Sequence, residues 1–126
     1  MRVQLWVQTA EDDWKAAQVM LAAGHWSHAA FLCHECLEKL LKALIIHRLS
    51  RVPPSSHTLL DLLRHSGLQP PVEVETALLK VSPHYAVARY PDAAGGRPSA
   101  YYNEALAKEL MQSTTEVKTW LEPHLK

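Results

Sequence analysis

The stretch Ala30–Leu44, which reads AFLCHECLEKLLKAL, is the most strongly helical part of this 126-residue chain. Glu35 precedes Lys39 by four residues, and such a pair adds about 0.2–0.5 kcal/mol to a helix. Glu38 and Lys42 repeat the spacing. The apolar residues recur three and four positions apart, which predicts a central helix with one broad apolar face. That face consists of Ala30, Cys33, Leu37, Leu40, Leu41, Leu44 and Ile45.

Glycine and proline residues divide the rest of the chain into further segments. Five Pro and Gly residues between Ser82 and Ser99 predict the longest irregular stretch there. The helices we expect run from about Ala10 to Gly24, from a Ser27 cap to about Leu49, from Ser56 or His57 to Gly67, from Val72 to about Val81, and from about Ala100 to Leu121.

No segment shows the alternation of apolar and polar residues that is typical of a strand. A chain of this length suffices for one hydrophobic core. The sequence therefore predicts an all-α fold, an antiparallel up-and-down helical bundle of about five helices, with residues 1–126 forming a single domain. Four tryptophans and a very apolar central helix in so small a chain predict a homodimer.

The overall charge gives no sign of a nucleic-acid-binding surface, since 13 Lys and Arg balance 13 Asp and Glu. Any site for RNA or a nucleotide must therefore be local. No apolar run is long enough for a signal peptide or a membrane span, so we expect a cytoplasmic protein that does not insert into membranes.

Cys33 and Cys36 form a C-x-x-C motif inside the central helix. A structural zinc site needs four ligands, and neither a second cysteine pair nor a suitable histidine pair exists. A redox motif would follow a strand and begin a helix, which this one does not. We therefore expect both cysteines to pack in the core, and we predict neither a metal nor a cofactor.

The segment from His84 to Asp92, HYAVARYPD, combines a planar cation with aromatic rings and an acid. Arg89 can bind phosphate through two nitrogens, and Tyr90 can stack on a base. This composition is consistent with a contact to a nucleotide or single-stranded RNA. The alternative is an ion pair between Arg89 and Asp92 that only closes the loop.

Several of these elements together resemble the HEPN family over roughly residues 9–122. They are the Ala30–Leu44 stretch with its Glu-Lys-x-x-Lys-Ala core, then Ser56-His57-Thr58-Leu59, then Arg89-Tyr90-Pro91-Asp92, in the same order. The resemblance implies a helical bundle that usually dimerises and is found beside, or fused to, minimal nucleotidyltransferases. Some similar proteins are metal-independent endoribonucleases, often the toxin of a toxin–antitoxin pair, with an Arg-x(4–6)-His motif. Others lack the motif and are regarded as nucleotide- or RNA-binding modules.

The Arg-x(4–6)-His spacing is met by Arg51 and His57, but these lie after the central helix, whereas the family motif belongs near the start of a late helix. At that late position Arg97 is followed by Tyr102, and no histidine occurs. Tyrosine, with a pKa of about 10, is a poor general base at neutral pH. Arg51, His57, Arg97 and Tyr102 remain the catalytic candidates.

The sequence therefore favours a binding module for a nucleotide or RNA over a ribonuclease. The alternatives are a metal-independent endoribonuclease and a purely structural oligomer. The partners we expect are a nucleotide or RNA, a stand-alone nucleotidyltransferase, and a second copy of the chain, with higher oligomers open. The candidate binding residues are Arg89, Tyr90, Asp92, His57, Lys39 and Lys42. Lys39 and Lys42 are equally explained by their helical charge pairs, and His57 by a position at a helix start.

Overall fold

Helix α2 (Trp26–Leu49) is the element against which the other long helices pack in the computed structural model, which describes residues 2–126. It contacts helices α1, α3, α4 and α6. The other elements are α1 (Val3–Ala22), α3 (Leu59–Ser66), α4 (Val72–Val81), η1 (Ser82–Tyr85), α5 (Pro91–Ala94), η2 (Pro98–Tyr101), α6 (Glu104–Leu121) and η3 (Glu122–Leu125), where η denotes a 3₁₀ helix.

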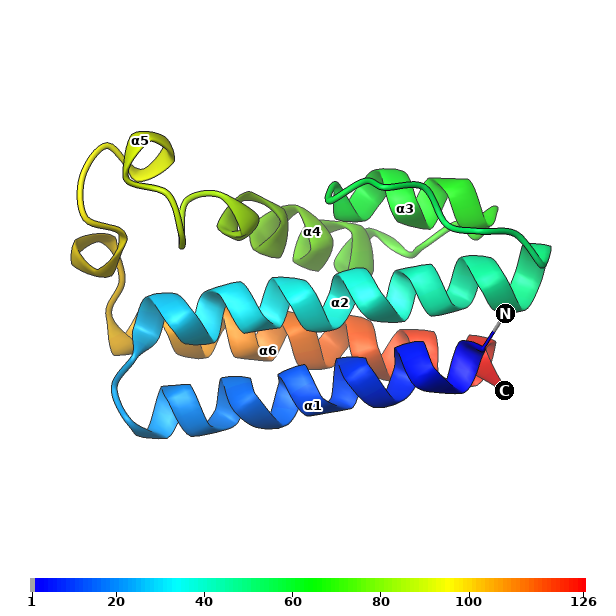
Figure 1. Ribbon diagram of the computed structural model, residues 1–126, viewed down its shortest axis with the longest axis horizontal. Helices are drawn as coiled ribbons and strands as arrows, with labels where there is room; N and C mark the ends of the chain where they lie inside the picture. Colours follow the sequence, from blue (N-terminus) through cyan, green and yellow to red (C-terminus); the bar gives the residue numbers. More distant parts are fainter. Residues whose placement is uncertain (1) are drawn as a thin grey trace.

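The three longest helices, α1, α2 and α6, run side by side, and α3 and α4 lie along the opposite side of α2 (Figure 1). The start of α1 and the C-terminal end of the chain lie at the same end of the bundle (Figure 1). No strand occurs within residues 2–126, so the all-α bundle is confirmed. The described residues form six α-helices where about five were predicted, because α5 is a single four-residue turn inside the irregular stretch.

The core forms around the apolar face that the sequence predicted for α2. All seven predicted residues are buried, and Leu37, Leu41, Leu44 and Ile45 are completely inaccessible. Burying each such aliphatic side chain contributes about 1.5–3 kcal/mol. Leucines of α3 and α4, together with Val117 and Leu121 of α6, complete the core. The core therefore fixes the middle of α2 rigidly.

Helix α1 begins at Val3, so the predicted start near Ala10 was wrong. Val7, one turn earlier than that start, already packs against the core, and this contact extends the helix towards its N-terminus. Thr9, the residue before the predicted start, does not cap the helix, because its hydroxyl donates to the carbonyl of Leu5 within the helix. The predicted end is correct, since Gly24 follows the helix with a φ of 81°.

Three other helices also begin at residues different from those predicted. Helix α2 begins at Trp26, and Ser27 is a buried first-turn residue and not its cap. Helix α3 begins at Leu59, two to three residues later than predicted. Helix α6 begins at Glu104, because the side chain of Asn103 accepts a hydrogen bond from the backbone N–H of Leu106 and caps the helix there.

Within residues 2–126, no helix combines the length and the apolar character that crossing a membrane requires.

Candidate functional site

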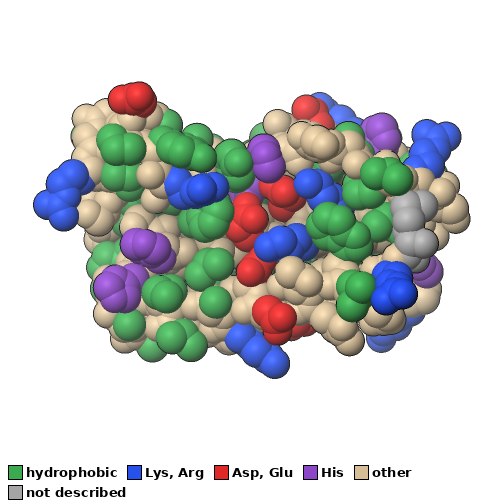
Figure 2. All heavy atoms as spheres, viewed as in Figure 1, with side chains coloured by type: hydrophobic (Ala, Val, Ile, Leu, Met, Phe, Trp, Pro, Cys, Tyr) green, Lys and Arg blue, Asp and Glu red, His purple; other side chains and the backbone are tan. Residues whose placement is uncertain are grey.

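A cluster of charged and histidine side chains lies over the middle of α2, where acidic and basic groups lie side by side on the surface (Figure 2). At its centre is Glu38, a buried carboxylate. Glu38 accepts a hydrogen bond from the ammonium of Lys42 at 3.0 Å and one from Nδ1 of His57 at 2.8 Å. The two bonds give the buried carboxylate the partners that its charge requires.

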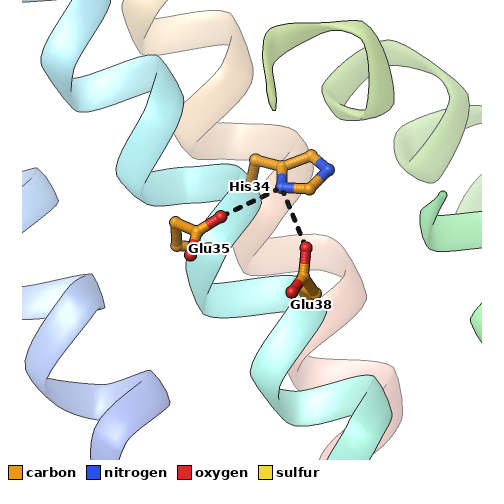
Figure 3. Close-up of side chains that lie close together, drawn as sticks. All are labelled: His34, Glu35 and Glu38. Carbon is orange, nitrogen blue, oxygen red and sulfur yellow. Dashed lines mark ion pairs between the residues drawn. The ribbon is translucent and has the colours of Figure 1, made fainter. Parts of the chain in front are cut away.

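His34 lies one turn before Glu38 and is completely buried. Its Nε2 is 2.9 Å from the backbone carbonyl oxygen of His57. Its Nδ1 faces the opposite way, 3.6 Å from one oxygen of Glu35 and 3.9 Å from one oxygen of Glu38 (Figure 3). His34 and Glu38 together therefore fix the loop residue His57 against α2.

Lys39 extends the cluster to α1. Its ammonium binds Asp13 of α1 and lies 3.7 Å from Glu35. Burial acts to raise the pKa of Glu35, but its contact with His34 and the charge of Lys39 outweigh burial, so the pKa of this carboxyl is lowered. Burial acts to lower the pKa of Lys39, yet the hydrogen bond and the charge of Asp13 raise it overall. The helical charge pairs predicted for Lys39 and Lys42 are confirmed, and both ammonium groups face carboxylates.

Tyr85, in η1, connects the cluster to Arg89. The ring of His57 stacks on Tyr85 with centroids 4.0 Å apart and planes 12° from parallel. The guanidinium of Arg89 lies 5.7 Å from the same phenol ring. It also lies 4.6 Å from the ring of Phe31 and 5.1 Å from that of Tyr90, so three aromatic rings surround it.

The alternative interpretation, an ion pair between Arg89 and Asp92 that closes the loop, is wrong. No ion pair joins the two side chains among residues 2–126, and Asp92 is an exposed residue in the first turn of α5. Aromatic rings and not a carboxylate therefore orient the guanidinium.

Arg89 and Arg97 line one cleft of about 530 Å³ at the end of the bundle where α2 begins. Seven other residues complete its lining: Ser27, His28, Phe31, Ala88, Pro91, Pro98 and Ser99. The lining contains no acidic side chain. Neither arginine forms an ion pair with any carboxylate of the chain from residue 2 onwards.

The Arg-x(5)-His spacing of Arg51 and His57 does not produce a joint site within one chain. Arg51 follows the end of α2, whereas His57 is bound to Glu38, twelve residues before Ser50. At 1.5 Å per helical residue, this separation is about 18 Å along α2. The loop crosses that distance in an extended path, so the two side chains lie far apart.

Tyr102 is not placed to act as a base. The side chain is buried beside His84, and its hydroxyl is hydrogen-bonded to Nδ1 of that histidine. Burial raises the pKa of Tyr102 to about 12. Burial lowers the pKa of His84, and a protonated His34 would lower it further. At neutral pH the protonated phenol therefore donates to the neutral imidazole, and Tyr102 does not line the cleft of Arg97.

Cys33 and Cys36 are free thiols in the core, as the sequence predicted. The thiol of Cys33 contacts the sulfur of Met111 at 3.3 Å. Burial raises the pKa of Cys33 to about 11 and that of Cys36 to about 12. Such thiols carry almost no thiolate at neutral pH and are poor nucleophiles and poor metal ligands.

A second cleft, of about 460 Å³, lies between α1 and α6. One of its two lysines, Lys118, is already engaged, 3.3 Å from Glu11 and 4.3 Å from the ring of Trp14, and the carboxylates of Glu11 and Glu122 line the cleft beside Lys126. This cleft therefore offers a phosphate less than the cleft of Arg89 and Arg97 does.

The structure brings together part of the predicted set and adds residues that the sequence reasoning missed. His57 and Arg89 come close through Tyr85, while Tyr90 lies beside Arg89. Lys39, Lys42, Tyr90, Asp92 and His57 do not line the cleft, and their role in binding stays a prediction. The missed residues are His28, Phe31, His34, Glu35, Glu38 and Tyr85. His34 and Glu38 could have been found from their i,i+4 spacing on a strongly apolar helix.

Comparisons with known proteins agree with this architecture. The family model for the HEPN domain matches residues 3–124. The chain is similar to the crystal structure of TT1696 from Thermus thermophilus, with 27% identity, 98% of each chain covered and a TM-score of 0.90. It is also similar to the crystal structure of ST0689, an archaeal HEPN homologue, with 28% identity, 100% of this chain and 99% of the other covered and a TM-score of 0.83. No curated protein matches. A family match over nearly the whole chain, with the helical bundle in place, shows that this chain belongs to the HEPN domain family.

Proposed function

We propose that this HEPN protein is a binding module for a nucleotide or single-stranded RNA, and that the cleft of Arg89 and Arg97 receives the phosphate. The supporting observation is the pair of guanidinium groups that share one cleft without a carboxylate partner among the described residues. Guanidinium nitrogens bind phosphate oxygens in pairs with charge-assisted hydrogen bonds. The net charge of the chain is zero, so attraction for an anion must come from such a local group.

The surroundings of Arg89 favour binding because they restrict the side chain before a ligand arrives. The rings of Phe31, Tyr85 and Tyr90 lie within 4.6–5.7 Å of the guanidinium and limit its motion. A restricted side chain loses less conformational entropy on binding. Tyr90 is exposed and supplies a ring on which a base can stack next to the phosphate.

Hydrogen-bonding groups at the start of α2 complete the cleft. Ser27, His28 and Ser99 line it beside the two arginines. Their hydroxyl and imidazole groups can donate to phosphate or sugar oxygens, which position a nucleic acid without reading its sequence. The proposed ligand is therefore recognised through its phosphate and one stacked base.

The biological setting we propose follows from family membership. The family resemblance implies a protein that acts with a minimal nucleotidyltransferase in a toxin–antitoxin-like pair. We propose that this chain has such a nucleotidyltransferase as its partner. We also propose a homodimer, whose formation would cover part of the exposed apolar surface that includes Leu5 and Val19 of α1. Light scattering at tens of micromolar should give twice the chain mass of 14.2 kDa, and a monomer would contradict the dimer.

A metal-independent ribonuclease is the second candidate, and the position of His28 favours it. This exposed histidine lines the same cleft as Arg89 and Arg97, so a proton-transfer group and two phosphate-binding cations occur together. Incubation of single-stranded RNA with the protein and a chelator separates the two functions. Cleavage that His28→Ala and Arg97→Ala abolish would establish the ribonuclease, whereas intact RNA supports the binding module.

Fluorescence anisotropy with a labelled single-stranded RNA tests the binding proposal. Arg89→Ala should weaken binding at least tenfold, since a hydrogen bond to a charged group contributes about 1.5–3 kcal/mol. Arg89→Lys should recover only part of the loss, because an ammonium cannot bind through two parallel nitrogens. Arg64→Ala is the control, since Arg64 is exposed on α3 and lies 3.8 Å from Asp61. Equal affinity of Arg89→Ala and the wild-type protein, with Arg89→Ala melting several degrees lower, would make Arg89 a loop-stabilising residue.

A further inference from the structure

Three metal-binding atoms converge on one point beside the middle of α2. They are Nδ1 of His34 and one carboxylate oxygen each of Glu35 and Glu38, and all three lie within 4.8 Å of one another. Nδ1 is 3.6 Å from the Glu35 oxygen and 3.9 Å from the Glu38 oxygen. Figure 3 shows both carboxylates reaching towards the same nitrogen of the imidazole.

The hydrogen bond made by Nε2 of His34 determines whether Nδ1 carries a proton. Nε2 lies 2.9 Å from the backbone carbonyl oxygen of His57, which can only accept, so Nε2 must hold the proton. In the neutral ring Nδ1 then presents a lone pair to two carboxylate oxygens. Nδ1 and the facing oxygen of Glu35 are both buried, and neither has a hydrogen-bond partner between residues 2 and 126. The facing oxygen of Glu38 also accepts from Nδ1 of His57 at 2.8 Å, which leaves it a further lone pair. The three electron-rich atoms still repel one another unless a cation lies between them.

The three side chains also have the outer-shell contacts that usually orient metal ligands. A metal-bound histidine usually donates its other N–H to a carbonyl or carboxylate, as His34 does to His57. Ligating carboxylates are in turn bonded on their outer oxygens. The outer oxygen of Glu38 accepts from Lys42 at 3.0 Å, and that of Glu35 lies 3.7 Å from Lys39.

We infer that His34, Glu35 and Glu38 bind one first-row divalent cation of the Zn²⁺ type. Zn²⁺ lies about 2.1 Å from imidazole nitrogen and carboxylate oxygen, which places tetrahedral neighbours roughly 3.4 Å apart. The two distances from Nδ1, 3.6 and 3.9 Å, need only a small contraction to reach that geometry, and the two carboxylate oxygens, at most 4.8 Å apart, must also move closer together. An imidazole with two carboxylates suits zinc, iron and manganese better than the oxygen-binding Mg²⁺. Three protein ligands leave a fourth position for water.

A proton on Nδ1 is the competing explanation, since it would make His34 an imidazolium between two acids. Charge-assisted N–H···O bonds are about 2.7–2.9 Å long. Both Nδ1 contacts, at 3.6 and 3.9 Å, are clearly longer than this, so such a proton would leave its hydrogen bonds unmade. The observed spacing fits a bridging cation better.

The C-x-x-C motif contributes nothing to this site, because Cys33 and Cys36 are high-pKa thiols of the core. The metal proposal does not depend on the function proposed for the cleft of Arg89 and Arg97. The two share only the contact of His57 with Tyr85.

Isothermal titration of the full, chelator-treated chain with Zn²⁺ and with Mn²⁺ tests the inference. One equivalent per chain should bind. Glu38→Gln and Glu35→Gln should each weaken binding more than about 100-fold, which is the upper end of the loss from removing an outer-shell partner. Glu35 lies at the edge of the cluster, so its variant should fold even where substitution of the fully buried His34 prevents folding. His25→Ala is the control, because His25 and His28 form a surface pair with centroids 5.8 Å apart that could hold an adventitious ion.

Nitrogen-15 NMR of the imidazole rings provides a second readout that does not depend on affinity. The inference predicts that Nδ1 of His34 is unprotonated and that its signal shifts when one equivalent of Zn²⁺ is added. Protonation of both ring nitrogens together with no Zn²⁺ or Mn²⁺ binding would overturn it. Binding that His25→Ala removes, or that both Glu35→Gln and Glu38→Gln leave unchanged, would also overturn it and identify an adventitious surface ion only.

Discussion

The imidazole of His57 stacks on the phenol ring of Tyr85, with centroids 4.0 Å apart and planes only 12° from parallel. This contact joins the loop after α2 to η1, which follows α4. On one side, His57 is bound to Glu38 and His34. On the other side, Tyr85 lies beside the guanidinium of Arg89. One ring pair therefore links the ionic cluster of α2 to the cleft that we propose for phosphate.

The stack should have a measurable coupling energy. We expect a double-mutant cycle of His57→Ala and Tyr85→Leu, followed by urea unfolding, to give a coupling of about 1 kcal/mol, since aromatic pairs contribute about 0.5–1.5 kcal/mol beyond their buried area. Tyr85→Leu should also weaken RNA binding, because Arg89 loses one of its three ring contacts. Additive effects of the two substitutions on stability would show that the rings are only neighbours.

Removing the buried carboxylate of Glu38 should be the most destabilising change on the polar side of α2. Glu38→Ala leaves Lys42, whose side chain is 11% exposed, without its partner. Breaking one side of a buried pair costs about 3 kcal/mol. Urea unfolding in buffer with a chelator measures this cost without any contribution from a metal.

A matched exposed pair provides the control for Glu38. Glu104 and Lys108 of α6 are also four residues apart in sequence, their charged groups lie 3.5 Å apart, and both side chains are about 60% exposed. We expect Glu104→Ala to change the unfolding free energy by less than about 0.5 kcal/mol. If the two substitutions had equal effects, Glu38 would not be the central residue of a buried network.

The two thiols should be inert in the folded protein. With pKa values of about 11 and 12, Cys33 and Cys36 carry a thiolate fraction of roughly one in a thousand or less at pH 8. Ellman's reagent should therefore detect almost no free thiol before denaturation and two equivalents per chain afterwards. Rapid reaction of either cysteine with the native protein would contradict the buried position of the motif.

Stability should depend on pH through His84. Burial lowers the pKa of His84 below its usual 6.5. The unfolded chain therefore binds this proton at a higher pH than the folded chain does. The contribution is fully present above pH 6.5 and is lost as the pH falls from there through the folded pKa. Urea unfolding between about pH 7.5 and 5.5 should show a smaller decrease for His84→Gln than for the wild-type protein.

The fold was predictable because its determinants are local. The apolar residues from Ala30 to Ile45 keep the spacing of an α-helix throughout. Gly24 and Gly67 follow the ends of α1 and α3, where the sequence predicted these helices to end. The starts of α1 and α6 were missed for specific reasons. Val7 packs against the core ahead of the predicted start at Ala10. Asn103 caps α6 just after the 3₁₀ helix η2, which begins at Pro98.

The site was less predictable because loops determine which residues meet. The tautomer of His34 depends on the carbonyl of His57, 23 residues away. Arg89 and Arg97 share a cleft because α5 and η2 return the chain to the start of α2. The hydrophobic pattern of the sequence does not predict the path of such an irregular segment. Sequence spacing likewise suggested the pair Arg51 and His57, which the extended loop separates along α2.

The location of the ligand is the most direct test of the binding proposal. A chain of 14.2 kDa suits a titration of backbone amide signals by NMR, with adenosine monophosphate or a short single-stranded RNA as the probe. The proposal predicts that the largest shifts fall on Ser27, His28, Ala88, Arg89 and Arg97, and that Arg89→Ala abolishes them. Shifts confined to the cleft between α1 and α6, around Gln4 and Thr115, or no shifts at millimolar ligand, would contradict it.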